Sequence, residues 1–295
     1  MVVHVVPTKP FRPIAVPPAP TFGSGRSLRS LHFAARNEPP PKLRFARGFS
    51  LVEMAVVLVI VALLIGGMLL PMTAQDDMRR TAETRATLVN IQEALLGFAV
   101  VNGRLPCPAS PNATGIENPI GDDCANFFNG FAPGVTLGLQ PVDPQGYVLD
   151  AWGRRIRYAV TNVNVGTTTR TFTTNGAMST AGLASLATAP DLRICSTATG
   201  VTNSGTATAT CAAGVSLAAN AVAVIYSIGK NAGWGGAGAD ETHNPNPQAT
   251  VSADRLFISH DTTPASAPNG EFDDIVVWLS PNILINRMIS AGRLP

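Results

Sequence analysis

A single acid interrupts the most apolar stretch of the sequence. Glu53 stands inside the run from Phe49 to Leu70, which carries no other charge. A carboxylate at the centre of a membrane helix costs about 2.5–3.5 kcal/mol on insertion scales, so a partner is needed to justify it. A buried polar pair of this kind sets register more reliably than it adds stability. The alternative is an acid that reaches the membrane interface near a helix end.

Four cysteines follow the apolar run: Cys107, Cys124, Cys195 and Cys211. Four cysteines allow three pairings. Pairing neighbours in the sequence would close two loops, each worth roughly 3 kcal/mol in the chain-entropy model. Zinc is the rival chemistry, but no Cys-x-x-Cys spacing occurs and no His stands near either pair. We therefore expect disulfides formed in an oxidising compartment, with the pairing left open.

Enzyme motifs find little support in the sequence. Residues 233–238 match Gly-x-Gly-x-x-Gly, but the residues that follow cannot form the helix that a dinucleotide site requires. His243 and His260 stand apart from the cysteines and from each other, which favours loop or structural roles. No Gly-x-Ser-x-Gly, His-Glu-x-x-His or Walker sequence occurs. We predict that the chain is not an enzyme. A membrane-tethered enzyme would need a deep pocket with convergent titratable groups.

The charge is unevenly distributed along the 295 residues. Residues 1–48 hold eight Lys or Arg and one acid, a net charge of +7, while the whole chain carries only +2. A basic arm before an apolar segment is typical of a cytoplasmic N-terminus, because Lys and Arg stay on that side of a first membrane span. A nucleic-acid-binding arm is the alternative, but no aromatic residues alternate with the basic ones.

The first hundred residues divide into three predicted segments. Residues 1–48 are a basic, Pro-rich leader whose Pro-rich part, 1–41, forms no regular helix. Residues 49–71 form the transmembrane half of a long helix, because about 20 apolar residues span a bilayer. Residues 72–103 form its amphipathic half, in which Leu88, Ile91, Leu95 and Phe98 recur at helical spacing. Asn102-Gly103 is the expected stop.

Residues 104–295 predict a domain built on an antiparallel sheet. Runs of β-type residues occur at 155–160, 168–173, 192–195, 221–228, 255–259 and 274–279. A few strands with one long helix indicate an α+β fold in which the sheet packs on the helix. Residues 161–220 are expected to form long loops. Ser280-Pro281 is a suitable start for a short closing helix that contains Leu284 and Met288.

The segment from Lys42 to Glu53 resembles the processing site of type IV pilins and type II secretion pseudopilins. That site has a basic leader ending in Gly, a cut before an aromatic residue and a Glu at the fifth position of the mature chain. The resemblance implies that prepilin peptidase cuts between Gly48 and Phe49 and removes the leader. It also implies that Phe49 becomes the N-methylated terminus, and that Glu53 sets filament register by pairing with the Phe49 amine of the next subunit.

The same resemblance implies a location and partners. We expect a single-pass inner-membrane protein with a cytoplasmic N-terminus and a periplasmic domain, which enters a filament after assembly. The expected partners are other pilin-like subunits, prepilin peptidase, the inner-membrane assembly platform and the membrane itself. The size and the long loops favour a minor subunit over an abundant one.

A second resemblance lies in the sheet domain. The stretch from Asp150 to Tyr158 is similar to an Asp-x-Trp-Gly stretch of the major pseudopilin, and Ser227-Ile-Gly229 with Asp273-Asp274 is similar to its C-terminal part. In that protein the intervening acidic loop holds calcium. The resemblance implies a calcium site at Asp240, Glu241, Asp273 and Asp274, with hard oxygen ligands. Ordinary solvated loop acids are the alternative, which we favour from the sequence.

Two function hypotheses remain beside the enzyme. The preferred one is a filament subunit that is pilin-like or pseudopilin-like. The other is a binding module at a filament tip that touches DNA, a secreted cargo or a surface. Arg154, Arg155 and Arg157 hint at a basic patch for DNA, although alternation along a strand would divide them between two faces.

Overall fold

A computed structural model describes residues 48–295, apart from 112–113, 121–122, 203–205, 207, 232–237 and 245–254. Within the helix that it describes, the side chains of residues 67–74 are not included. The chain forms two units, Met1–Val57 and Leu58–Pro295. Of the predicted leader, 1–48, the structure describes only Gly48.

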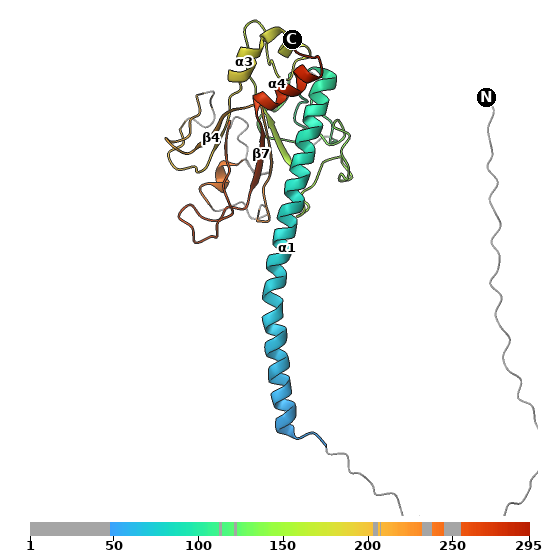
Figure 1. The fold of residues 1–295 in the computed structure, drawn as a ribbon, viewed down its shortest axis with the longest axis vertical. Coiled ribbons are helices and arrows are strands. Elements are labelled where there is room, and N and C mark those ends of the chain that lie inside the picture. Colours follow the sequence, from blue (N-terminus) through green and yellow to red (C-terminus); the bar gives the residue numbers. More distant parts are fainter. Residues whose placement is uncertain are drawn as a thin grey trace, which may run out of the picture. The chain divides into compact units, whose positions relative to one another are not determined.

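The helix α1, the long helix of Figure 1, extends over Leu51–Asn102. Leu88, Ile91 and Leu95 are fully buried in the main core, as their three- and four-residue spacing requires. The helix stops at the predicted place: Gly103 has a φ of +67° and donates its N–H to the carbonyl of Ala99 at 2.8 Å. A glycine adopts this left-handed conformation without the strain of a β-carbon.

The described part of the chain contains no helix that is both long enough and apolar enough for a membrane crossing. Residues 67–71 of the predicted transmembrane half, 49–71, lie among the side chains that the structure does not describe.

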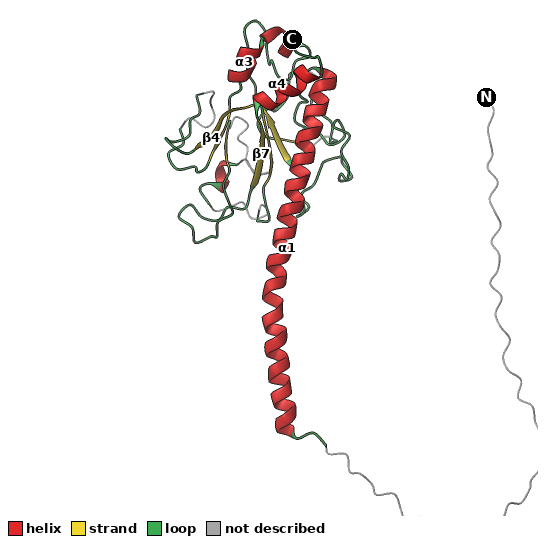
Figure 2. Cartoon of the chain, viewed as in Figure 1, coloured by secondary structure: helices red, strands yellow, loops and turns green. Residues whose placement is uncertain are grey.

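A four-stranded antiparallel sheet follows the order β1-β2-β5-β7. Figure 2 draws the strands of the structure in yellow. Its strands are β1 (Gly130–Phe131), β2 (Arg157–Val160), β5 (Ala223–Ser227) and β7 (Ile275–Leu279). Every residue of β2 and β5 is buried, which explains their continuous runs of apolar residues. Three of these strands fall inside predicted β-type runs, so the α+β fold with an antiparallel sheet is confirmed.

A second sheet of three strands has the order β4-β3-β6, formed by Ser216–Ala221, Leu192–Cys195 and Leu256–Ile258. The pair β3–β4 is antiparallel, but β3 and β6 run parallel. The sequence predicted β3 and β6 as strands but did not predict a parallel pair, which depends on the long connection between them.

The prediction of a strand at 168–173 is wrong. This segment forms turns, with an isolated bridge between Val165 and Thr168. The threonine hydroxyls bond to the local backbone. Oγ1 of Thr168 donates to the carbonyl of Val165 at 2.7 Å, and Oγ1 of Thr171 accepts the backbone N–H of Val165 at 3.0 Å. Such local bonds compete with a strand ladder. The expected loops of 161–220 also contain two short helices, α2 (Ala177–Ala181) and α3 (Leu183–Thr188).

The predicted closing helix is confirmed as α4 (Pro281–Ser290), with Pro281 in its first turn. Ser280 occupies the N-cap position, but its side chain makes no capping bond. After α4, Arg293 donates from Nε to the carbonyl of Val100 and from a second guanidinium nitrogen to that of Val101, both at 2.6 Å. The end of the chain therefore supplies the donors that the last carbonyls of α1 lack.

Candidate functional site

The predicted processing segment is exposed and has no regular secondary structure where the structure describes it. Gly48, Phe49 and Ser50 have no regular secondary structure, and the Phe49 side chain is 78% exposed. The helix α1 begins two residues after Phe49. The bond between Gly48 and Phe49 is therefore accessible and lies outside the helix.

Glu53 has a local role that the prediction did not include. The Oγ of Ser50 accepts a hydrogen bond from the backbone N–H of Glu53 at 3.1 Å, which makes Ser50 the N-cap of α1. Ser-x-x-Glu is the capping-box spacing, and an acid in the first turn also complements the helix dipole. The signal was present in the sequence at residues 50–53. A registering role for Glu53 stays a prediction.

The helix after Ser50 presents apolar side chains without cover. All described residues from Leu51 to Gly66 are exposed, among them Leu58 at 65% and Leu63 at 71%. An exposed apolar surface of this extent marks a membrane or a protein interaction site.

Both cysteine pairs form disulfides between neighbours in the sequence. Cys107 bonds to Cys124 and Cys195 bonds to Cys211, with Cα–Cα distances of 5.2 and 5.6 Å. The pairing that the sequence left open is thereby assigned. The loops that they close span 17 and 16 residues, for which the chain-entropy model gives roughly 3 kcal/mol each.

A buried ion pair supports the first disulfide loop. Arg104 donates two hydrogen bonds to the carboxylate of Glu117, at 2.7 and 2.8 Å, and both residues are buried. The same carboxylate accepts the N–H of Cys107 at 3.1 Å. Removing one partner of such a pair would leave a buried charge uncompensated.

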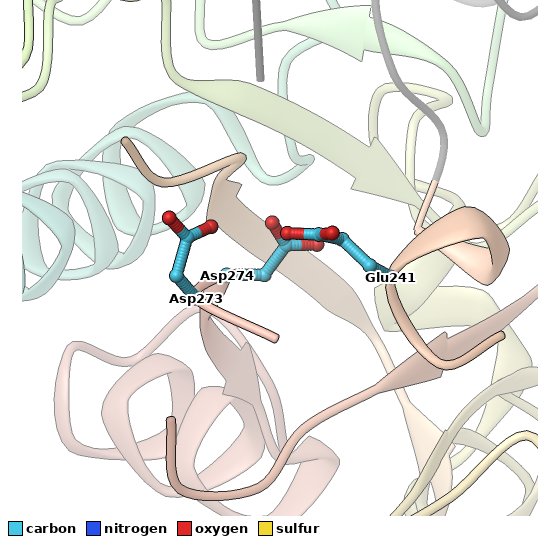
Figure 3. Close-up of side chains that lie close together, drawn as sticks. All are labelled: Glu241, Asp273 and Asp274. Atoms are coloured by element: carbon cyan, nitrogen blue, oxygen red, sulfur yellow. The ribbon is translucent and has the colours of Figure 1, made fainter. Parts of the chain in front are cut away.

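Three of the four predicted metal ligands converge. Figure 3 shows Glu241 reaching from the short helical turn η1 (Glu241–His243) toward Asp274, with Asp273 beside it at the start of β7. One carboxylate oxygen from each of the three residues lies within 4.8 Å of the others. Glu241 and Asp274 are only 6% and 5% exposed. Glu241 and Asp274 are thus withdrawn from solvent and Asp273 is half-buried, unlike the solvated loop acids that we favoured from the sequence.

The three carboxylates have oxygens without hydrogen-bond partners among the described residues: both oxygens of Glu241, and Oδ1 of Asp273 and of Asp274. Their other bonds hold them in place. Oδ2 of Asp273 accepts the N–H groups of Lys230 and Asn231 at 2.9 and 3.1 Å, and Oδ2 of Asp274 accepts from Asn244 at 2.8 Å.

Close burial of three acids changes their proton affinity. Burial, reinforced by the neighbouring Asp273 carboxyl, raises the pKa of Glu241 to about 7. Burial likewise raises the pKa of Asp273, and it raises the pKa of Asp274 well above the usual value for an aspartate. A cluster that resists ionisation alone would gain from a divalent cation, and hard carboxylate oxygens suit calcium or magnesium.

The fourth predicted ligand, Asp240, faces another way. Its carboxylate accepts hydrogen bonds from Oγ1 of Thr197 at 3.0 Å, the N–H of Ala198 and the amide of Asn269 at 2.9 Å. His260 lies 3.3 Å from it and stacks on Phe272. Asp240 therefore ties the loops around β3 and β6 together and is not part of the three-acid cluster. His243 ends η1, and of the glycine-rich run 233–238 the structure describes only Gly238.

The Asp150 motif has a structural role beside the cluster. Oδ1 of Asp150 accepts the N–H groups of Trp152 and Arg154 at 2.9 and 2.8 Å and so closes its own turn. Oδ2 accepts the hydroxyl of Ser227 at 2.5 Å, and the Ser227 Oγ accepts the N–H of Gly229 at 3.2 Å. The two stretches of the second resemblance are thus joined by hydrogen bonds, next to the turn that holds Asp273.

The three arginines that hinted at a DNA-binding patch are engaged within the protein. Arg155 pairs with Asp143 at 2.8 Å and covers the Tyr147 ring at 4.0 Å. Arg157 is buried over the Phe131 ring, and Arg154 donates to the carbonyl of Lys230 at 3.1 Å. They do not form the exposed basic surface that DNA binding would need.

Residues 43–69 match the prokaryotic N-terminal methylation motif, the signature of pilins and pseudopilins. The matched range contains Gly48, Phe49 and Glu53 and ends within the apolar run. The chain therefore carries the N-terminal signature that pilins and pseudopilins share. No curated protein and no solved structure matches the chain.

Proposed function

We propose that this chain is a minor subunit of a type IV pilus or type II secretion filament, cut by prepilin peptidase between Gly48 and Phe49. The methylation motif at residues 43–69 carries this proposal. The exposure of Gly48, Phe49 and Ser50, which have no regular secondary structure, supports it, because a peptidase needs access to the bond. N-methylation then takes place on the new Phe49 amine.

In this proposal the apolar run holds the protein in the inner membrane, with the N-terminus in the cytoplasm. The basic charge of residues 1–48 supports that orientation. The uncovered side chains from Leu51 to Gly66 first contact lipid and later contact the same helix of neighbouring subunits. The two disulfides support a periplasmic location for the sheet domain.

The decisive measurement is the N-terminal mass of the protein isolated from membranes, with and without an active prepilin peptidase. A mature chain that starts at methylated Phe49 only when the peptidase is present supports the proposal. Gly48→Val should block the cut, whereas the control Gly66→Ala should not, because Gly66 lies beyond the bond in open space. An intact leader in every sample would refute it.

We also propose that Glu241, Asp273 and Asp274 hold a calcium ion in the periplasm. The observation that carries this is the set of partnerless carboxylate oxygens in a buried cluster. A divalent cation would supply the charge that these oxygens lack and would release the protons that burial favours.

The cation proposal is tested by thermal unfolding of the full chain in detergent micelles, with calcium, with magnesium and with chelator. Calcium should raise the midpoint, because binding to the folded state alone adds about 2.7 kcal/mol at a hundredfold excess over Kd. Asp274→Asn should abolish the calcium response. The control Asp123→Asn removes an exposed acid outside the cluster and should leave the response intact. A calcium-independent midpoint in the unmodified chain would contradict the site.

A further inference from the structure

Asn231 has a buried side-chain oxygen without a partner, next to the three-acid cluster. Its Oδ1 is withdrawn from solvent and accepts no hydrogen bond from any described residue. Buried polar atoms in folded proteins are hydrogen-bonded in the great majority of cases, and a bound ion or water is a common reason for an exception. Because an amide oxygen can only accept, the partner that Oδ1 lacks is a hydrogen-bond donor or a cation.

Asn231 lies between two of the acids. Its backbone N–H donates to Oδ2 of Asp273 at 3.1 Å. Its side chain acts on Glu241: burial raises the pKa of that carboxyl to about 7, and the Asn231 amide is the strongest influence that opposes the rise. Neither oxygen of Glu241 accepts a hydrogen bond of ordinary geometry from a described residue. The Asn231 amide is therefore close to the Glu241 carboxylate without being committed to it.

The turn that carries Asn231 is held on several sides. The backbone N–H of the preceding residue, Lys230, also donates to Oδ2 of Asp273, at 2.9 Å. The carbonyl of Lys230 accepts a hydrogen bond from Arg154 at 3.1 Å, and its Nζ pairs with Asp77 of α1 at 2.8 Å. Asn231 is thus placed beside the acids by contacts that need no ligand, which lowers the ordering cost when one binds.

The acids alone offer an incomplete set of ligands. The partnerless carboxylate oxygens are both of Glu241 and one each of Asp273 and Asp274, which makes four. Calcium takes roughly six to eight oxygen ligands, which include Asn side-chain carbonyls as well as carboxylates. A neutral oxygen adds a ligand without a further negative charge, so it does not increase the repulsion among the buried acids. Oδ1 of Asn231 would be the fifth protein oxygen.

We infer that Asn231 is a ligand of the cation through its Oδ1, together with Glu241, Asp273 and Asp274. The inference rests on the proposed cation site and adds a neutral residue to its acids. Five protein oxygens select calcium over magnesium. Magnesium demands near-octahedral geometry and usually keeps several of its waters, whereas calcium accepts a larger and more flexible set of protein oxygens.

The test measures calcium and magnesium binding by isothermal titration calorimetry. It uses the full chain in detergent micelles, after a chelator has removed divalent cations. Asn231→Leu keeps the approximate size of the side chain and removes its oxygen. This variant should bind calcium at least about tenfold more weakly, equivalent to about 1.4 kcal/mol. Its magnesium affinity should change much less, because magnesium retains water in place of a fifth protein oxygen.

Asn231→Asp should have the opposite effect on calcium, since it replaces the neutral oxygen by a charged one. Calcium binding should tighten at least about threefold, because a fourth carboxylate attracts the cation more strongly. In chelator the same variant should have a lower thermal midpoint, because a further acid joins the buried cluster. The control Asn282→Leu replaces an exposed asparagine of α4 and should change neither affinity. Circular dichroism verifies that each variant is folded.

Three results would overturn the role of Asn231, and they differ in what they leave standing. Calcium binding that Asp274→Asn abolishes and Asn231→Leu leaves unchanged would keep the three acids as the site without Asn231. Calcium binding that Asn231→Asp and Asn231→Leu weaken equally would make Asn231 a support of the fold beside the site. No calcium binding to the unmodified chain would overturn the site and this inference together.

Discussion

The carboxylate of Asp273 fills the space in which a β-carbon at Gly229 would stand. Gly229 also has a φ of +63°, a conformation that side chains other than glycine rarely adopt. Its neighbour Lys230 donates its N–H to Asp273 and pairs with Asp77 on α1. The absence of a side chain at Gly229 thus leaves room for the Asp273 carboxylate. The hydrogen bond of Lys230 to this carboxylate and its ion pair with Asp77 then hold the turn against α1.

Gly229→Ala should destabilise the protein by about 1–3 kcal/mol, through backbone strain together with displacement of Asp273. It should also weaken the stabilisation by calcium, because one ligand is moved. The measurement is the thermal midpoint with and without calcium. The control is Gly214→Ala. Gly214 also has a positive φ, +80°, but a β-carbon added there would meet no other atom within 4 Å. This variant should lose stability without losing the calcium response, and equal behaviour of both variants would argue against the steric role.

The pKa of Glu241 predicts an unusual pH dependence in the absence of divalent cations. The folded-state pKa is about 7 against an ordinary value of 4.5, so the folded state binds more protons than the unfolded state between these pH values. Stability should therefore fall as pH rises through this window and stay low above it. Urea unfolding in chelator at about pH 5 and about pH 8 measures the difference.

Glu241→Gln should flatten this pH profile, since the substituted amide does not titrate. Calcium should raise stability more at the higher pH, where fewer protons compete for the same oxygens. A chelator-treated chain that becomes more stable from about pH 5 to about pH 8 would show that the cluster ionises freely, contrary to the raised pKa values.

Ser50 and Glu53 allow the capping and the registering roles to be separated. Ser50→Ala removes the cap, which is worth about 1 kcal/mol locally, but keeps the acid. Glu53→Leu removes the acid and leaves the Ser50 hydroxyl able to bond the same N–H. We expect Glu53→Leu to permit membrane insertion and cleavage but to impair filament assembly, and Ser50→Ala to leave assembly close to normal. Filament yield by electron microscopy and cleavage by mass analysis are the readouts, and normal assembly of Glu53→Leu would exclude a registering role.

The stability losses caused by substituting Arg104 and Glu117 should not be additive. Arg104→Met alone or Glu117→Met alone should cost about 3–5 kcal/mol, because each leaves a buried charge without its partner. The double substitution should cost less than the sum of the two. Denaturant unfolding of the four proteins, with both disulfides intact, gives the coupling energy. Additive losses would mean that the two side chains do not act as a pair.

The sequence predicts the elements whose burial pattern is regular and local. The apolar spacing of α1, the runs of β5 and β7 and the start of α4 at Pro281 were all readable in this way. Within residues 161–220 only β3 was readable, and the run 168–173 was misread as a strand because its threonine side chains bond to nearby backbone. β1 is two residues long, too short to leave a pattern.

The candidate cation site, too, could be predicted from the sequence only in part. The pair Asp273-Asp274 was readable as a potential site, but its partner stands 32 residues earlier in η1, on the other side of β6. Neighbouring residues in a short helical turn point in different directions. Asp240 and Glu241 were therefore grouped by sequence although only Glu241 faces the other acids. The Ser-x-x-Glu spacing at residues 50–53 is a readable capping signal, but the prediction for Glu53 did not include it.

The contact of Arg293 with Val100 and Val101 has a consequence for the order of events during biogenesis. The guanidinium that donates to the last carbonyls of α1 belongs to a residue that follows them by 193 and 192 positions in the sequence. During synthesis, the last carbonyls of α1 lack these two donors until Arg293 has been made, so the end of the first helix is completed late. Loss of the Arg293 side chain would therefore destabilise the end of the helix that forms first in the chain.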